Sequence, residues 1–85
     1  SDPNTNVRLA ALDALGKFRS ENGVRQALIR TLSTEKDPII QIALIKLMVQ
    51  MKEKTVIQQL EKIAKDRKTM DAVKTEAYSG IFKLS

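Results

Sequence analysis

The side chains that most often carry out chemistry in proteins are largely missing from this chain. It contains no His and no Cys, which removes the commonest acid–base group, the thiolate nucleophile and the usual zinc ligands. The carboxylates of Asp13, Asp37, Asp66 and Asp71 fall at expected turns or on separate helices, so they form no close pair. With three glycines in all, the chain has no glycine-rich phosphate loop. We therefore expect a protein that is not an enzyme and that uses no cofactor and no metal ion.

Basic side chains are the other residues that could bind a ligand. Fifteen Lys and Arg against ten Asp and Glu give the chain a net charge of +5. Lys52 and Lys54 lie in an expected turn, and a second cluster ends an expected helix. That cluster consists of Lys62, Lys65, Arg67 and Lys68. Phosphate binding would gain from aromatic stacking, but aromatic residues are scarce and acidic residues interrupt the basic stretches. A basic surface that binds nucleic acid or anionic lipid is thus an alternative. The favoured interpretation is that these basic side chains face solvent on the helix surfaces and bind no ligand.

The secondary-structure elements that position these side chains can be inferred from a sequence motif that recurs every 33 residues. Its copies occupy residues 7–16, 40–49 and 73–82, the last of them faint. Each copy opens on an aliphatic residue that is followed by a polar or basic one. Repetition at this period is typical of stacked supersecondary units. No segment alternates apolar and polar residues as a strand does, so the chain is predicted to be all-α.

Five helices separated by short polar breaks are expected. They run over 5–19, over 23–33, from Asp37-Pro38 to Met51, from Thr55 to the break at Arg67, and over 71–84. Asp37 can cap free amides and Pro38 suits a first helical position, while Thr55 with Gln58 forms a capping-box pattern. The first, third and fifth helices are the recurring type B, and the other two are their partner type A. The order B-A-B-A-B makes one domain, 1–85, with unit one at 5–19, unit two at 23–51 and unit three at 55–84.

Two stretches carry a recognisable motif. Residues 4–16 read Asn-Thr-Asn-Val-Arg-Leu-Ala-Ala-Leu-Asp-Ala-Leu-Gly, and residues 37–41 read Asp-Pro-Ile-Ile-Gln. They resemble the short, bacterial-type HEAT repeat: an Asp-Pro-type turn, then Val-Arg, Ala-Ala and Ala-Leu-Gly. The third copy is weaker, with Met70 at the turn Asp and Phe82 at the Gly. The resemblance implies a right-handed α-solenoid with B helices on its concave face, and protein–protein scaffolding as its usual role.

A weaker, overall similarity connects the chain to the C-terminal repeat domains of anti-sigma-factor-like proteins, without a shared motif. Because the chain opens within a repeat, we expect a piece of a longer protein whose uncapped ends can self-associate. No apolar stretch approaches the ~18 residues of a membrane span, so no membrane insertion is expected within the chain. Its localisation is cytoplasmic by default and extracytoplasmic if the parent protein has an upstream membrane anchor.

One apolar arc of each B helix is expected to face a type A helix as core. The arcs are Val7, Ala10, Ala11, Ala14, Leu15 and Phe18; Ile40, Ala43, Leu44, Leu47, Met48 and Met51; and Val73, Glu76, Ala77, Gly80, Ile81 and Leu84.

A second apolar stripe lies on the opposite side of the B helices. It consists of Leu9, Leu12, Ile42, Ile45, Val49, Tyr78 and Phe82. As an open concave groove it would bind a helix or an apolar peptide of a protein partner, which makes the chain a non-catalytic interaction scaffold. A rotation of the helices would instead turn Leu12 and Ile45 into the seams between B helices. The chain could also be a purely structural spacer in a longer repeat array. The positions of these residues around each helix are compatible with both an open groove and a seam between B helices.

A polar column occupies the Arg position of the motif. Its members are Arg8, Gln41 and Lys74. In the HEAT family this residue commonly bonds to a turn carboxylate, so the resemblance implies a structural ladder between repeats in which Asp37 serves Arg8 or Gln41. A neighbouring column at the groove edge consists of Asp13, Lys46 and Ser79, and Asp13 is expected to pair with Lys46.

Overall fold

The computed structural model describes residues 3–85 of the chain. Within that range five α-helices and one 3-10 turn form, without a strand. The elements are α1 (Pro3–Gly16), α2 (Asn22–Thr34), α3 (Pro38–Gln50), η1 (Lys54–Val56), α4 (Ile57–Lys65) and α5 (Asp71–Leu84). The prediction of an all-α protein with five helices is confirmed.

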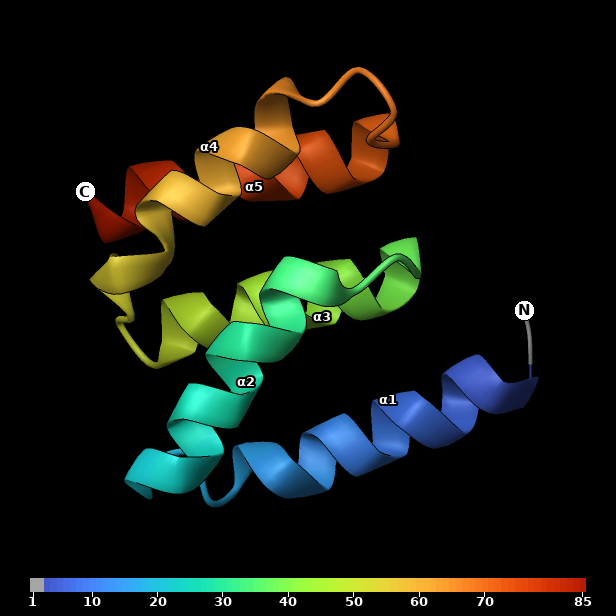
Figure 1. Cartoon of the computed structure of the whole chain (residues 1–85), viewed down its shortest axis with the longest axis vertical. Helices are drawn as coiled ribbons and strands as arrows, with labels where there is room; N and C mark the ends of the chain where they lie inside the picture. Colours follow the sequence, from blue (N-terminus) through green and yellow to red (C-terminus); the bar gives the residue numbers. More distant parts are fainter. Residues whose placement is uncertain (1–2) are drawn as a thin grey trace.

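The helices form two layers (Figure 1). The three type B helices α1, α3 and α5 lie side by side and run in the same direction, and α3 packs against both of the others. In the second layer α4 runs antiparallel on α5, and α2 crosses α3 obliquely. The extents of 31 × 30 × 17 Å agree with this, because the shortest one accommodates two helix layers about 8–10 Å apart. The arrangement is that of a short α-solenoid.

The hydrophobic core lies between the two layers and comes from α2, α3, η1, α4 and α5. Its fully enclosed side chains are Leu32, Leu44, Ile45, Met48, Val56, Leu60 and Val73. In α3 the expected arc is buried at Ile40, Leu44, Leu47 and Met48, and the arc of α5 is buried at four of its six positions. Burial of aliphatic side chains at a 3.6-residue period is what fixes these helices on one another, since each buried methylene contributes about 0.8 kcal/mol.

Helix α1 departs from the prediction that its apolar arc is core. Val7, Leu15 and Phe18 are 68%, 47% and 56% exposed, and the alanines of the same arc are exposed too. The reason is that α2 packs on α3, so no type A helix within residues 3–85 covers this side of α1. On the opposite side of α1, Thr5 and Gly16 are buried, and Leu9 and Leu12 are partly buried against the core.

The start of α3 follows the local chemistry of its sequence. The Asp37 carboxylate accepts a hydrogen bond from the Ile39 amide at 2.9 Å, and Pro38 occupies the first turn, as predicted. Helix α4, in contrast, begins later than its capping-box pattern predicts. The Thr55 hydroxyl donates to the Glu53 carboxylate instead of capping an amide, and the chain makes the 3-10 turn before α4 starts at Ile57.

The C-terminal ends of α1 and α3 are fixed by local hydrogen bonds. Helix α1 ends at Gly16 and not at Arg19, because the amides of residues 17–19 bond three residues back and the Arg19 guanidinium donates to the Gly16 carbonyl at 2.7 Å. Helix α3 ends in a Schellman motif: Lys52 takes a left-handed conformation with φ 55°, and the Glu53 amide donates to the Met48 carbonyl at 3.0 Å. A lysine at that position is strained, because a side chain disfavours positive φ.

Candidate functional site

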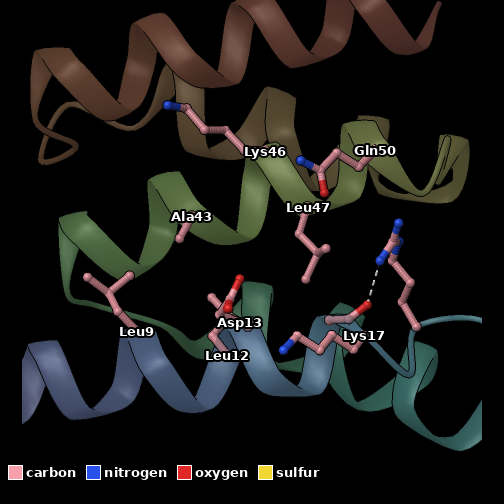
Figure 2. Close-up of a pocket in the computed structure, with 10 residues that line it drawn as sticks. Leu9, Leu12, Asp13, Lys17, Ala43, Lys46, Leu47 and Gln50 are labelled. Atoms are coloured by element: carbon pink, nitrogen blue, oxygen red, sulfur yellow. Dashed lines mark hydrogen bonds between the residues drawn. The ribbon is translucent and has the colours of Figure 1, made fainter.

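The layer of α1, α3 and α5 leaves one of its faces uncovered by α2 and α4, and we call this the open face. A groove of about 330 Å³ runs across it between α1 and α3. Figure 2 shows this α1–α3 groove with Leu9 and Leu12 rising from α1 and Ala43 and Leu47 descending from α3. These four side chains form an apolar floor between two parallel helices. Water on such a floor is readily displaced by an apolar side chain of a ligand.

A second, smaller groove adjoins the first. It has a volume of about 240 Å³ and lies between α3 and α5, with Val49 and Gly80 in its lining. Lys46 and Gln50 of α3 line both grooves and therefore form the ridge between them. The open face is thus a continuous surface that runs across all three type B helices.

Polar side chains around the grooves form two columns with the 33-residue spacing. The first consists of Asp13, Lys46 and Ser79, and the second of Lys17, Gln50 and Lys83. Sequence reasoning found the first column and missed the second, although each member of the second follows a member of the first by four residues. The expected pair of Asp13 and Lys46 is not among the ion pairs within residues 3–85, which are Arg8–Glu35 and Arg25–Glu53.

The predicted apolar stripe is divided by the structure among four environments. Leu9, Leu12 and Val49 line the grooves of the open face. Ile42 is half-buried against the core. Tyr78 and Phe82 are 55% and 83% exposed on α5 and do not line either groove. Ile45 has no exposed surface, so it is not available to a partner and the expectation that it lines a groove is wrong.

The cause is the close approach of α3 and α5 at a glycine. A methyl group added to Gly80 would lie 3.2 Å from Cγ2 of Ile45 and 3.6 Å from Cγ2 of Val49. Ile45 therefore belongs to the seam between these two helices. The equivalent approach of α1 to α3 occurs at Gly16, where an added methyl group would lie 3.4 Å from Cδ1 of Leu47. By the same register, Tyr78 and Phe82 occupy the outer side of α5, where no further helix follows within the described residues.

Of the residues expected to form a ladder, Arg8 and Gln41 bond to Glu35 and not to Asp37, and Lys74 takes part in neither of the ion pairs within residues 3–85. Arg8 pairs with the buried carboxylate of Glu35, two residues before Asp37, and the Gln41 side-chain amide donates to the Glu35 carbonyl at 3.0 Å. Asp37 instead accepts from the Thr5 hydroxyl at 2.6 Å. That hydrogen bond is the main reason that the pKa of Asp37 lies below its ordinary value, and the charge of Arg8 contributes.

A second buried carboxylate, Glu53, ties α2 to the connection between α3 and α4. Arg25 holds it with two nitrogens, Nε at 2.5 Å and Nη2 at 3.1 Å, and the Thr55 hydroxyl also donates to it. These donors, Arg25 first, lower the pKa of Glu53. Glu35 and Glu53 occur in polar connections that suggest solvent exposure, so sequence reasoning missed both. Each is a structural anchor because its charge is buried and paired.

The basic cluster at the end of α4 is mixed in sign. Lys62 and Lys65 line a shallow depression together with Glu61 and Asp66. Lysines in a last helical turn also complement the helix dipole, which explains them without a ligand. Among the described residues no group of three or more acidic, His or Cys side chains is placed to hold a metal ion, and no helix is long and apolar enough to span a bilayer.

Two layers of helical hairpins in a 33-residue register define a helical-repeat protein. A family model of HEAT repeats matches residues 1–81, so the chain belongs to the HEAT-repeat family, as its motif indicates. Proteins of this family generally act as protein-interaction scaffolds and are typically non-enzymatic. Comparisons with curated proteins and with solved structures gave no significant match.

Proposed function

We propose that the chain is a non-catalytic interaction module that holds a helix or an extended peptide of a partner protein against its open face. The observation that carries the proposal is the α1–α3 groove, in which Leu9, Leu12 and Ala43 keep part of their surface exposed to solvent beside the buried core residue Leu47. Exposed apolar surface of this kind, bordered by polar side chains, is characteristic of interaction sites. The corrected site comprises Leu9, Leu12, Ala43 and Leu47 with Val49 of the adjoining groove, and Ile45 is removed from it.

The shape of the open face favours an elongated ligand. Its three helices run side by side, and a helix of 14 residues such as α1 is about 21 Å long. The two grooves follow the helices and meet at the ridge of Lys46 and Gln50. A partner helix or peptide in the α1–α3 groove would place side chains on the floor at every turn, which is the mode of helix-in-groove recognition.

The test is a selection of binders followed by mapping. Helical and extended peptides displayed in a library are selected on the 85-residue chain, and the amide shifts of the labelled protein are followed on titration. We expect shifts at Leu9, Lys46 and Gln50 and none at Gln58 or Lys62 on α4. Shifts confined to α2 and α4, or a failure to select any peptide, would count against the open face as the site.

Matched substitutions complete the test. Leu9 and Ile63 are both half-buried apolar residues, but Ile63 lies on α4, away from the open face. Leu9→Ser is expected to weaken peptide binding by about tenfold, because it removes much of the apolar contact of one side chain. Ile63→Ser should leave the affinity within about twofold. Equal losses in the two variants would indicate general destabilisation and not a site.

A further inference from the structure

We propose that the α1–α3 groove selects an acidic amphipathic segment: aliphatic side chains enter the groove, and carboxylates on either side bind its basic rim. The proposal rests on the proposed function and adds the chemistry of the partner. Its basis is the unequal charge around an apolar floor. Lys17, Arg19 and Lys46 border the groove, and Asp13 is the one acidic residue that lines it.

The basic rim is not neutralised by the protein itself. Lys17 and Lys46 are exposed and take part in neither of the ion pairs found within residues 3–85. Arg19 uses its Nη1 group on the Gly16 carbonyl, which fixes the guanidinium at one end of the groove, and it makes no ion pair with the described residues. An acidic ligand would therefore gain attraction without having to break an existing contact.

The position of the charges matches an amphipathic partner. The basic groups come from both sides of the groove, Lys17 and Arg19 from the turn that follows α1 and Lys46 from α3. In Figure 2 Lys17 lies on the α1 side of the groove beside Leu12, and Lys46 lies on the α3 side with its amine directed toward α5. Carboxylates one turn before and after an aliphatic residue, at i ± 3 or i ± 4 on a helix, can thus face both walls at once.

The adjoining groove has a smaller excess of basic over acidic residues in its lining. It adds Lys83 on α5 together with Glu76, so its charges nearly balance. The selectivity is therefore assigned to the α1–α3 groove, with Lys46 on the ridge acting on both sides.

A protein segment fits this groove better than a nucleic acid does. Nucleic-acid binding without base reading depends on phosphate contacts and on aromatic stacking, and no aromatic residue lines either groove. The leucine floor would stay unused by a phosphate backbone. It would be covered by aliphatic side chains of a peptide, which supply affinity where exposed charge pairs alone supply little.

The experiment uses three synthetic helical peptides of about 15 residues, a length at which helices become stable in water. The first has leucines along one face with glutamates beside them, the second has lysines in place of the glutamates, and the third has serines in place of the leucines. Binding to the 85-residue chain is measured by fluorescence anisotropy. We expect the glutamate peptide to bind at least about tenfold more tightly than the other two. Equal affinity of the glutamate and lysine peptides, or no binding of any, overturns the proposal.

A matched pair of variants separates local charge from net charge. Lys46→Glu and Lys68→Glu make the same change in net charge at two exposed lysines, and Lys68 lies far along the chain in the connection to α5. Lys46→Glu should weaken the glutamate peptide by about fivefold or more and strengthen the lysine peptide, since one attraction becomes a repulsion. Lys68→Glu should change either affinity by less than about twofold. Equal effects of the two variants would show unspecific attraction by the net charge and refute the proposal.

Two further outcomes distinguish the remaining possibilities. A thymidine oligonucleotide that displaces the glutamate peptide as well as unlabelled peptide does, while the serine peptide binds as tightly as the leucine one, would identify a polyanion site instead. Selection of uncharged or basic peptides that map to the open face and lose affinity in Leu9→Ser would sustain the proposed function and overturn only the acidic preference.

Discussion

The substitution Ile45→Ala tests whether the stripe residue at the centre of α3 belongs to a seam or to a groove. Ile45 has no exposed surface, and it touches α5 where Gly80 brings the two helices together. Removing three carbon atoms at about 0.8 kcal/mol each costs about 2.4 kcal/mol in transfer free energy. A cavity adds to this, because Leu60 and Val49 already border the same point and cannot both move in. We expect a loss of about 3 kcal/mol, within the range for buried Ile→Ala changes.

That loss is large for a domain of this size. At about 0.05–0.15 kcal/mol per residue, an 85-residue chain has a free energy of unfolding of about 4–13 kcal/mol. The midpoint of thermal unfolding, followed by circular dichroism, should fall by about 12 °C or more. In a solenoid each unit contacts only its neighbours, so the α4–α5 hairpin should separate from α3 first and broaden the transition.

The control is Ile42→Ala, three residues earlier on the same helix. Ile42 is half-buried, so the same three carbon atoms should cost about 1 kcal/mol. Both substitutions replace Ile by Ala within α3 and gain the same helix propensity, which leaves packing as the difference between them. A loss at Ile45 of no more than the loss at Ile42 would refute the assignment of Ile45 to the seam.

Three other outcomes are expected. Lys52→Gly should stabilise the fold by about 1 kcal/mol in urea unfolding, because glycine relieves the left-handed strain at the end of α3; a loss of stability would contradict this. Folding lowers the pKa of Glu53 below its ordinary 4.5, so its pairing with Arg25 stabilises the fold above about pH 4.5 and is lost as the pH falls through the lowered pKa. Urea midpoints should therefore fall in acid, and Glu53→Gln should reduce that dependence. Phe82→Ser should leave the unfolding temperature unchanged, since the side chain is 83% exposed, and should reduce any self-association in sedimentation at high concentration; a large loss of stability would show that Phe82 is packed.

Several local features were predictable because short-range chemistry decides them. The cap of Asp37 and Pro38 at the start of α3 and the extent of α5 occur as expected, since both depend on residues within one or two turns. The capping-box pattern at Thr55 failed because the buried carboxylate of Glu53, two residues away, competes for the same hydroxyl. That competition depends on Arg25 bringing α2 to this connection, which no local pattern contains.

The candidate site was predictable as a side of the molecule but not as a set of residues. Placing residues on a helical wheel at about 100° each puts Ile45 on one side of α3 together with Ile42 and Val49, but the wheel does not record how closely the next helix approaches that side. The glycine at Gly80 allows α5 to approach closely enough to cover Ile45, which leaves Lys46 and Gln50 as the ridge of the open face.

The sequence by itself determined that this protein is a stack of helical hairpins, because a 33-residue period with aliphatic residues at helical spacing can bury its apolar faces only between neighbouring units. Only the tertiary structure decided which faces meet. It placed Glu35, and not Asp37, opposite Arg8, and it left the apolar arc of α1 exposed. Crossing angles and interhelical distances arise from many side chains packing at once, whereas a periodic pattern records only the spacing along each helix.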